Sequence, residues 1–207
     1  MKARTNNPAR TMSDIIAVAT AEFANKGLSG ARIDAIAEQT QTSKRMIYYY
    51  FGNKEGLYIA VLEDAYRRIR TIEASLKLED TPPVDALKKL VRFSVDYHWQ
   101  NPDFVRLIMN ENMHNGAFLA QSKLIKTLNT PAIDAIKNVY QRGLDAGVFR
   151  AGIDLVDLHM SASALSFHTV SNQATFGQIF GLNLNDPDQL ERRRSSIVEM
   201  VLRFVCK

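Results

Sequence analysis

The chain has 207 residues, of which 46% are hydrophobic and 23% are charged, a composition typical of globular proteins. Its single cysteine, Cys206, excludes an internal disulfide framework. No apolar run reaches the roughly 18–20 residues that a membrane-spanning helix needs, and the N-terminus lacks the apolar stretch of a secretory signal. We therefore expect a cytoplasmic protein that makes no contact with a membrane.

The formal net charge of +4 is unevenly distributed. Residues 1–54 hold eight Lys and Arg against four Asp and Glu, whereas residues 55–207 hold 18 of each kind. Residues 1–11 are polar and are predicted to form a flexible basic arm. The concentration of positive charge in the first quarter of the chain predicts a polyanionic partner for that quarter.

Three short helices are predicted between residues 11 and 54. Ser13 can cap a first helix to about Lys26, in which apolar residues repeat every four positions. A second helix is expected over 32–40, and Ser43 can cap a third. A tight turn between the second and third helices is typical of a helix-turn-helix unit, whose third helix enters the major groove of DNA.

The third helix carries the side chains that suit such a role. Ile47 and Phe51 lie one turn apart and can anchor it, while Lys44, Arg45 and Tyr49 face away from that anchor. Lys and Arg donate to guanine O6 and N7, and tyrosine hydroxyls can donate to phosphate oxygens. A solvated face with aromatic packing is the alternative interpretation, but the neighbouring helices and the charge distribution favour DNA binding.

Residues 11–58 resemble the DNA-binding domain of the TetR family of bacterial transcriptional regulators. The resemblance rests on residues 21–23, Gly27, 36–38, 43–44, 47–51 and 53–57. This chain differs from the usual pattern at Arg32, Gln41, Thr42 and Met46. The resemblance implies that the positions facing the bases are Lys44, Arg45, Met46 and Tyr49. The positions facing the phosphates are Tyr48, Tyr50 and Lys54. Arg32 and Thr42 lie near the backbone, and Ser43 is the capping serine.

A long helix from Lys54 to about Leu78 is predicted next, with Arg67, Arg68 and Arg70 on its solvent face. In the family such a helix links the DNA-binding head to the body, which makes it the expected route of signalling. Further helices are expected over 83–99 and 104–114, on both sides of a break near 129–131, over 155–176, and in the last part of the chain.

A pocket for a small molecule is predicted in the body. The helix beginning at Phe104 is apolar almost all round yet carries Glu111, which either marks the polar end of a pocket or pairs with a nearby cation. Residues 102–118 also faintly resemble the pyrimidine-responsive regulators of the family. The candidate pocket residues are apolar, aromatic or hydrogen-bonding, namely Trp99, Met109, Glu111, Asn112, Met113, His114, Phe118, Tyr140, Phe167 and His168.

A subunit interface is predicted on the last two helices, because the helix over 155–176 has apolar or small residues on two faces. The family resemblance implies that these helices form a four-helix bundle with those of a second subunit. The candidate interface residues are apolar or small side chains at helical spacing, namely Leu158, Ala162, Leu165, Thr169, Ile197, Met200, Val201 and Phe204.

The sequence thus predicts an all-α protein of about nine helices, with a helix-turn-helix domain over 1–54 and a ligand-binding and dimerisation domain over 55–207. We expect a repressor that binds double-stranded, near-palindromic operator DNA as a homodimer and is released by an unidentified small-molecule effector. No catalytic motif or metal-ligand spacing stands out, so we expect no enzyme activity, cofactor or metal.

Other functions stay open from the sequence. The same fold could activate transcription or respond to a protein partner. A helical ligand-binding or enzyme-like protein without a DNA role is the third alternative, with Glu111 and His114 as its acid and base.

Overall fold

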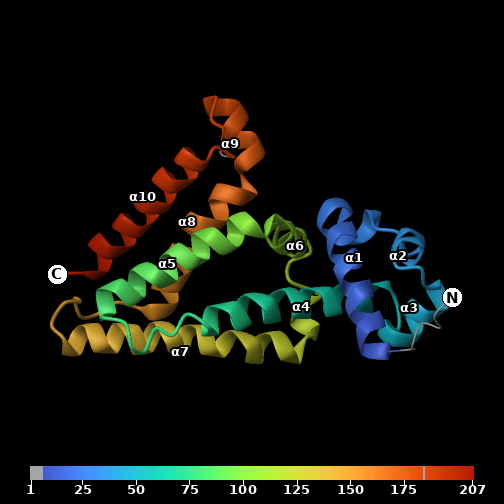
Figure 1. Ribbon diagram of the computed structural model, residues 1–207, viewed down its shortest axis with the longest axis horizontal. Coiled ribbons are helices and arrows are strands. Elements are labelled where there is room, and N and C mark those ends of the chain that lie inside the picture. Colours follow the sequence, from blue (N-terminus) through green and yellow to red (C-terminus); the bar gives the residue numbers. More distant parts are fainter. Residues whose placement is uncertain (1–6, 184) are drawn as a thin grey trace. The chain divides into compact units, whose positions relative to one another are not determined.

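The computed structural model describes residues 7–183 and 185–207, and within them the fold is all-α. Ten α-helices and one 3-10 turn are present in these ranges, one helix more than the expected number. Their order and bounds are α1 Pro8–Gly30, α2 Ile33–Gln39, α3 Lys44–Phe51, α4 Lys54–Ala74, α5 Pro83–Gln100, α6 Pro102–Met113, η1 Leu119–Gln121, α7 Lys123–Asp145, α8 Leu155–Ser171, α9 Gln173–Phe180 and α10 Pro187–Val205 (Figure 1).

Several of the expected helix boundaries need correction, including the end of α4, which lies at Ala74 and not near Leu78. α1 begins at Pro8 because Asn7 caps it through Arg10 N–H, so the second half of the expected arm is helical, while residues 1–6 lie outside the described residues. α7 continues through Pro131, where buried Ala132 and Ile136 keep the helix in the core although one backbone hydrogen bond is lost. The expected helix over 155–176 ends at Ser171, because Asn172 leaves helical geometry and α9 starts after it.

The chain forms two compact units that alternate along the sequence. Unit 1 contains Met1–Arg67 and Arg106–Lys126, and unit 2 contains Arg68–Val105 and Thr127–Lys207. This division differs from the expected boundary after residue 54. α4, α6 and α7 each contribute residues to both units.

Unit 1 is built on the four-residue repeat of α1. Ile15, Ala19 and Phe23 are fully buried, and the ring of Phe23 meets that of Tyr58 edge-to-face at 5.1 Å. Glu22 is also buried, and its carboxylate accepts hydrogen bonds from Lys26 Nζ at 2.9 Å and Arg32 N–H at 3.0 Å. Burial alone would raise the pKa of Glu22, but these bonds lower it overall, so the ionised carboxylate fixes the start of α2 to α1.

Unit 2 has its core between α5, α7, α8 and α10. Figure 1 shows α5 running alongside α8 and α10, and buried side chains from all four helices join in one cluster. The Arg142 guanidinium donates to three backbone carbonyls after α4, those of Leu78, Glu79 and Thr81, at 2.7–2.9 Å. These three bonds tie α7 to the turn between α4 and α5, so Arg142 holds that turn in place.

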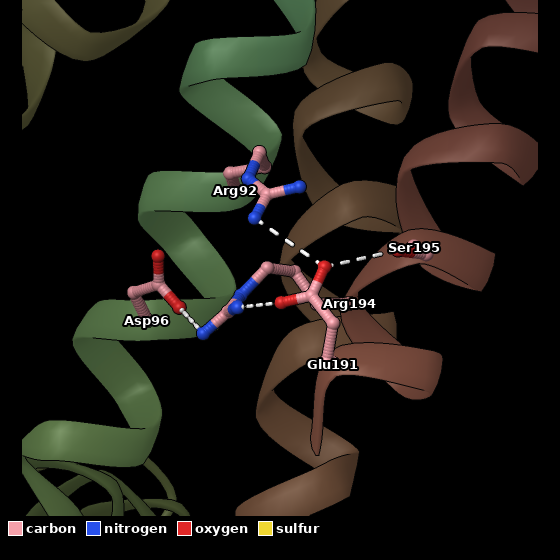
Figure 2. Close-up of polar contacts among 5 residues, drawn as sticks. All are labelled: Arg92, Asp96, Glu191, Arg194 and Ser195. Atoms are coloured by element: carbon pink, nitrogen blue, oxygen red, sulfur yellow. Dashed lines mark hydrogen bonds and ion pairs between the residues drawn. The ribbon is translucent and has the colours of Figure 1, made fainter. Parts of the chain in front are cut away.

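A polar network joins α5 to α10 at the edge of this core (Figure 2). Arg194 forms ion pairs with Asp96 of α5 and with Glu191 of its own helix. Glu191 also accepts hydrogen bonds from Arg92 at 3.4 Å and Ser195 Oγ at 3.1 Å. Networks of this kind near solvent add modest stability and mainly fix the register of the two helices.

The last residues of the chain close unit 2. Phe149 and Cys206 form an isolated antiparallel bridge, with Arg150 N–H donating to Val205 O at 3.0 Å and Lys207 N–H to Val148 O at 3.2 Å. Phe149 is buried beside Gly143 of α7, where a Cβ atom would lie 1.9 Å from the phenyl ring. Gly143 therefore provides the space that Phe149 occupies.

Candidate DNA-contacting surface

The turn between α2 and α3 leaves the N-terminus of α3 exposed to solvent. Gln41 adopts φ 51°, and the N–H of Thr42 donates to Ala37 O at 3.0 Å, which closes the end of α2. Ser43 caps α3 by accepting a hydrogen bond from Met46 N–H at 3.2 Å, as predicted. The cap leaves the first turn of α3 exposed, with its backbone N–H groups and two cations.

One face of α3 holds the helix in unit 1 and the opposite face is open. Ile47 is fully buried and Phe51 is half-buried, which confirms the anchor expected from their spacing. Lys44, Arg45 and Tyr48 are exposed, and Tyr49 leaves 77% of its surface open. Residues 44 and 48, like residues 45 and 49, lie one helical turn apart, so the four side chains form two adjacent rows.

The structure assigns different surroundings to the other predicted DNA-binding residues. Met46 and Thr42 are half-buried, and Arg32 is exposed at the N-cap position of α2 without capping that helix through its side chain. Tyr50 is half-buried, with its ring 5.4 Å from that of Tyr49. Lys54 donates to Ser29 O at 3.2 Å, which fixes it to the end of α1.

Lys44 has a partner that sequence reasoning missed. Its Nζ lies 2.6 Å from Asp34 Oδ1 at the start of α2, and both side chains are about half exposed. An exposed ion pair of this kind is weak, so a phosphate or a base edge could displace Asp34. Among the described residues, Arg45 forms no such ion pair, so its exposed guanidinium has no anion to leave before it meets a ligand.

The predicted pocket residues are divided between the two units. Met109, Asn112 and Met113 are exposed in unit 1, where the rings of His114 and Phe118 are 5.6 Å apart. Glu111 is buried, and its Oε1 accepts from the N–H groups of Phe118 and Leu119 at 2.9 and 2.8 Å. Its carboxylate therefore caps the segment after α6, and the expected pairing with a cation is replaced by backbone bonds.

In unit 2, Tyr140 also has a structural role. Its hydroxyl donates to Arg150 O at 2.8 Å and accepts from Ile153 N–H at 3.2 Å. Trp99 and Phe167 are half-buried, whereas His168 lines an open cavity of about 410 Å³ with Phe176. Because the Tyr140 hydroxyl already makes these two hydrogen bonds, it is not free to bind an effector.

The predicted interface residues differ in their exposure within the single chain. Leu158, Thr169, Ile197 and Val201 are buried inside the single chain, because these stripes of α8 and α10 face the core of unit 2. Ala162 and Leu165 are half-buried against the same core. The remaining two, Met200 and Phe204, are exposed, as are Val156 and Met160 of α8, at 61% each.

Unit 2 contains a buried polar cluster that the sequence analysis missed. We use "the polar cluster" for Arg70, Glu73, His98, His159 and Ser166. Arg70 and Glu73 form an ion pair with side chains 13% and 9% exposed, which corrects the expected solvent-facing position of Arg70. His98 Nδ1 lies 3.0 Å from Ser166 Oγ. Glu73 and His159 also border a small cavity of about 20 Å³, whose other lining residues are aliphatic except for Ser94.

Burial controls the charges of the polar cluster. It raises the pKa of Glu73, against the lowering effect of Arg70. It lowers the pKa of His98 to about 4, with further lowering by Arg70 and His159, and it lowers the pKa of His159 as well. Both imidazoles are therefore neutral at pH 7, and Arg70 is the cation of the polar cluster.

His98 should make the stability of unit 2 depend on pH. Between its folded pKa of about 4 and the ordinary value of 6.5, only the unfolded chain takes up the proton, so stability falls as the pH falls. We expect a loss of about 2 kcal/mol from pH 7 to pH 5. Urea unfolding followed by fluorescence of Trp99, the single tryptophan, measures it.

The matched variant is His98→Asn, whose side-chain amide can keep the hydrogen bond to Ser166 without titrating in this range. This variant should lose about 2 kcal/mol less than the parent protein over the same pH interval. An equal loss in both proteins would contradict the assignment to His98.

Two parts of the chain match families of known proteins. Residues 15–61 match the family described as "Bacterial regulatory proteins, tetR family", and residues 83–201 match "Tetracyclin repressor-like, C-terminal domain". The HTH-type transcriptional repressor NicS of Pseudomonas putida is 32% identical over 94% of this chain and 92% of its own. The HTH-type transcriptional repressor SCO4008 of Streptomyces coelicolor is 37% identical over 53% of this chain and 54% of its own.

Solved structures show the same fold. A bacterial regulatory protein in the tetR family from Rhodococcus RHA1 superposes with a TM-score of 0.74 at 19% identity, over 96% of this chain and 98% of its own. No helix in the described ranges is long and apolar enough to cross a membrane. Within the same ranges, no group of three or more His, Cys, Asp and Glu side chains is placed to hold a metal ion.

Proposed function

Because the chain belongs to the TetR family of bacterial transcriptional regulators, we propose that it represses transcription in the cytoplasm by binding operator DNA through α2 and α3. The observation that carries this proposal is the exposed face of α3, with two cations at its N-terminus and two tyrosines one turn further on. Both the helix N-terminus and the cations attract phosphate, and Arg45 can bind a guanine edge through two hydrogen bonds.

Selection from random duplex DNA tests this proposal. The purified protein is incubated with the library at about 0.1 M salt, where the Debye length of about 10 Å damps non-specific attraction. A two-fold symmetric motif, with half-sites about one helical turn apart or somewhat more, is the expected result. Sequence-independent binding, or none, would contradict the proposal.

We propose a homodimer held by the apolar residues that α8 and α10 leave exposed. Val156 and Met160 lie one turn apart on α8, and Met200 and Phe204 lie one turn apart on α10. Side chains of this size are normally buried, and a second copy of the chain would cover them. A dimer would also present two copies of α3 to the two halves of a symmetric operator.

The dimer proposal predicts the behaviour of a double variant, Met160→Glu with Met200→Glu. Burying four carboxylates in a symmetric interface is unfavourable, so light scattering should show half the parental mass. Lys88→Glu, on the exposed face of α5, is the control and should stay dimeric. A double variant that keeps the parental mass would exclude this surface.

Release by a small-molecule effector completes the proposal. α4 is one helix whose first part lies in unit 1 and whose last residues, from Arg68 on, lie in unit 2. A ligand that favours one position of α4 would change operator affinity by its difference in affinity for the two states. If every ligand that binds unit 2 leaves operator affinity unchanged, this part of the proposal fails.

A further inference from the structure

The polar cluster is an unusual feature of an otherwise aliphatic interior. Burying the charged pair of Arg70 and Glu73 costs free energy that an apolar pair would not, so its presence is not explained by stability alone. Arg70 Nε is buried and finds no hydrogen-bond partner among the residues that the structure describes. An unpartnered donor of a buried guanidinium is an open position for an acceptor.

The geometry of the guanidinium limits what that acceptor can be. Glu73 binds Arg70 through Nη1. The Nε–H points along the other edge of the planar group, together with one N–H of Nη2, and this edge matches the two oxygens of a carboxylate. Glu73 therefore leaves unused the part of Arg70 that holds carboxylates through two parallel bonds.

His98 adds a second fixed polar group. Ser166 Oγ lies 2.9 Å from Ser163 O, 3.2 Å from Ala162 O and 3.0 Å from His98 Nδ1. We assign its one proton to a backbone carbonyl, as is common for a serine inside a helix, and the donor role in the other bond to His98 Nδ1, which leaves the lone pair on Nε2. The ring stacks on Phe104, with centroids 5.9 Å apart, and meets Phe167 edge-on at 5.7 Å, which fixes its orientation.

The walls near this polar cluster are mostly apolar. Besides Glu73, His159 and Ser94, the small cavity is lined by aliphatic side chains of four helices, namely Leu87, Leu90, Val91, Ile136, Leu158, Ala162 and Val201. Its volume of about 20 Å³ suffices for roughly one water molecule, so a larger guest must displace part of this lining. α4 and α8 carry the residues that such a guest would move, Glu73 and His159.

We propose that the polar cluster is the effector site of unit 2 and that its effector is a small carboxylic acid with an apolar body. The carboxylate takes the open edge of Arg70, and the apolar body enters the aliphatic lining. This inference rests on the proposed regulatory function, since it names the class of ligand that the regulator would sense. A neutral amide of the same shape lacks the charge that Arg70 would pair with.

The test compares acids with their amides. Benzoate and hexanoate, with benzamide and hexanamide as matched neutral probes, are titrated into the full-length protein while Trp99 fluorescence and thermal unfolding are recorded. Both acids should bind at least ten times more tightly than their amides. Amides that bind as tightly as the acids, or millimolar acids that do not bind, would overturn the inference.

Variants assign the binding to Arg70. Arg70→Lys keeps the charge but loses the planar edge, and it should weaken benzoate binding at least tenfold. Arg70→Gln with Glu73→Gln replaces the ion pair by two neutral amides of similar size, so it protects the fold while removing benzoate binding. Lys88→Gln removes an exposed cation of α5 and should bind benzoate like the parent. Unchanged benzoate binding in the Arg70 variants would exclude Arg70.

Operator binding by the same samples separates the two proposals. If the parent binds a selected operator but no acid, the effector class is wrong and the repressor function stands. If it binds no operator under any condition, the proposed function fails, whatever the acids do.

Discussion

Gly143→Ala should be the most damaging single-methyl addition in unit 2. The new Cβ would lie 1.9 Å from the ring of Phe149, which is itself buried, so the ring or α7 must move. Overpacking of this kind typically destabilises by about 1–3 kcal/mol, and we expect the upper end because Phe149 also pairs with Cys206. Urea unfolding followed by Trp99 fluorescence measures the loss.

The control for this prediction is Gly30→Ala in α1. There the added Cβ meets only Lys26 Cβ at 3.4 Å, and the residue has no left-handed backbone conformation that would strain an alanine. Alanine is favoured over glycine in helices, so this variant should be neutral or slightly more stable. Parental stability in Gly143→Ala would mean that Phe149 has room to repack.

Arg45→Ala should weaken specific operator binding by about 1–3 kcal/mol, which is roughly 5- to 150-fold. Arg45 is exposed at the first turn of α3, one turn before Tyr49, and among the described residues it has no ion pair to break before it reaches a base. The predicted signature is a relaxed preference at one base pair of each half-site. Fluorescence anisotropy with the selected operator and with single-base variants measures it.

Lys44→Ala tests the other cation in the first turn of α3. Lys44 must leave Asp34 before it contacts DNA, so its removal should cost less affinity than the loss of Arg45. Asp34→Ala should strengthen binding slightly, because it frees Lys44 and removes a negative charge near the phosphates. A loss confined to Lys44→Ala, with Arg45→Ala like the parent, would reverse the roles that we assign.

Local patterns predicted most of the head, although α1 is capped by Asn7 and not by Ser13 as expected. The four-residue repeat of Ile15, Ala19 and Phe23, the Ser43 cap and the anchor at Ile47 are all short-range features, and the structure confirms each of them. The helical periods of the body also predicted its all-α class. These signals work because helix formation depends on neighbours within one or two turns.

Long-range pairings were not predictable in the same way. Nothing in the sequence indicates that Asp34 meets Lys44, or that His98 meets Ser166, 68 positions later in the chain. The apolar stripe of α4 predicts that Arg70 lies on the opposite face with Arg67 and Arg68, yet its side chain is only 13% exposed. The helical spacing of apolar residues on α8 predicts that a face of this helix is buried. It does not show whether the same chain or a second subunit covers that face.

The packing of α10 and the bridge after it affect how the protein folds during synthesis. Core residues of α10, Ile197 and Val201, pack with α5, and the bridge at Cys206 closes the same core. Unit 1 needs no residue beyond Lys126, so it can fold on the ribosome while translation continues. Unit 2 cannot complete its core until α10 has left the ribosomal tunnel, and α5 keeps an apolar face uncovered until then.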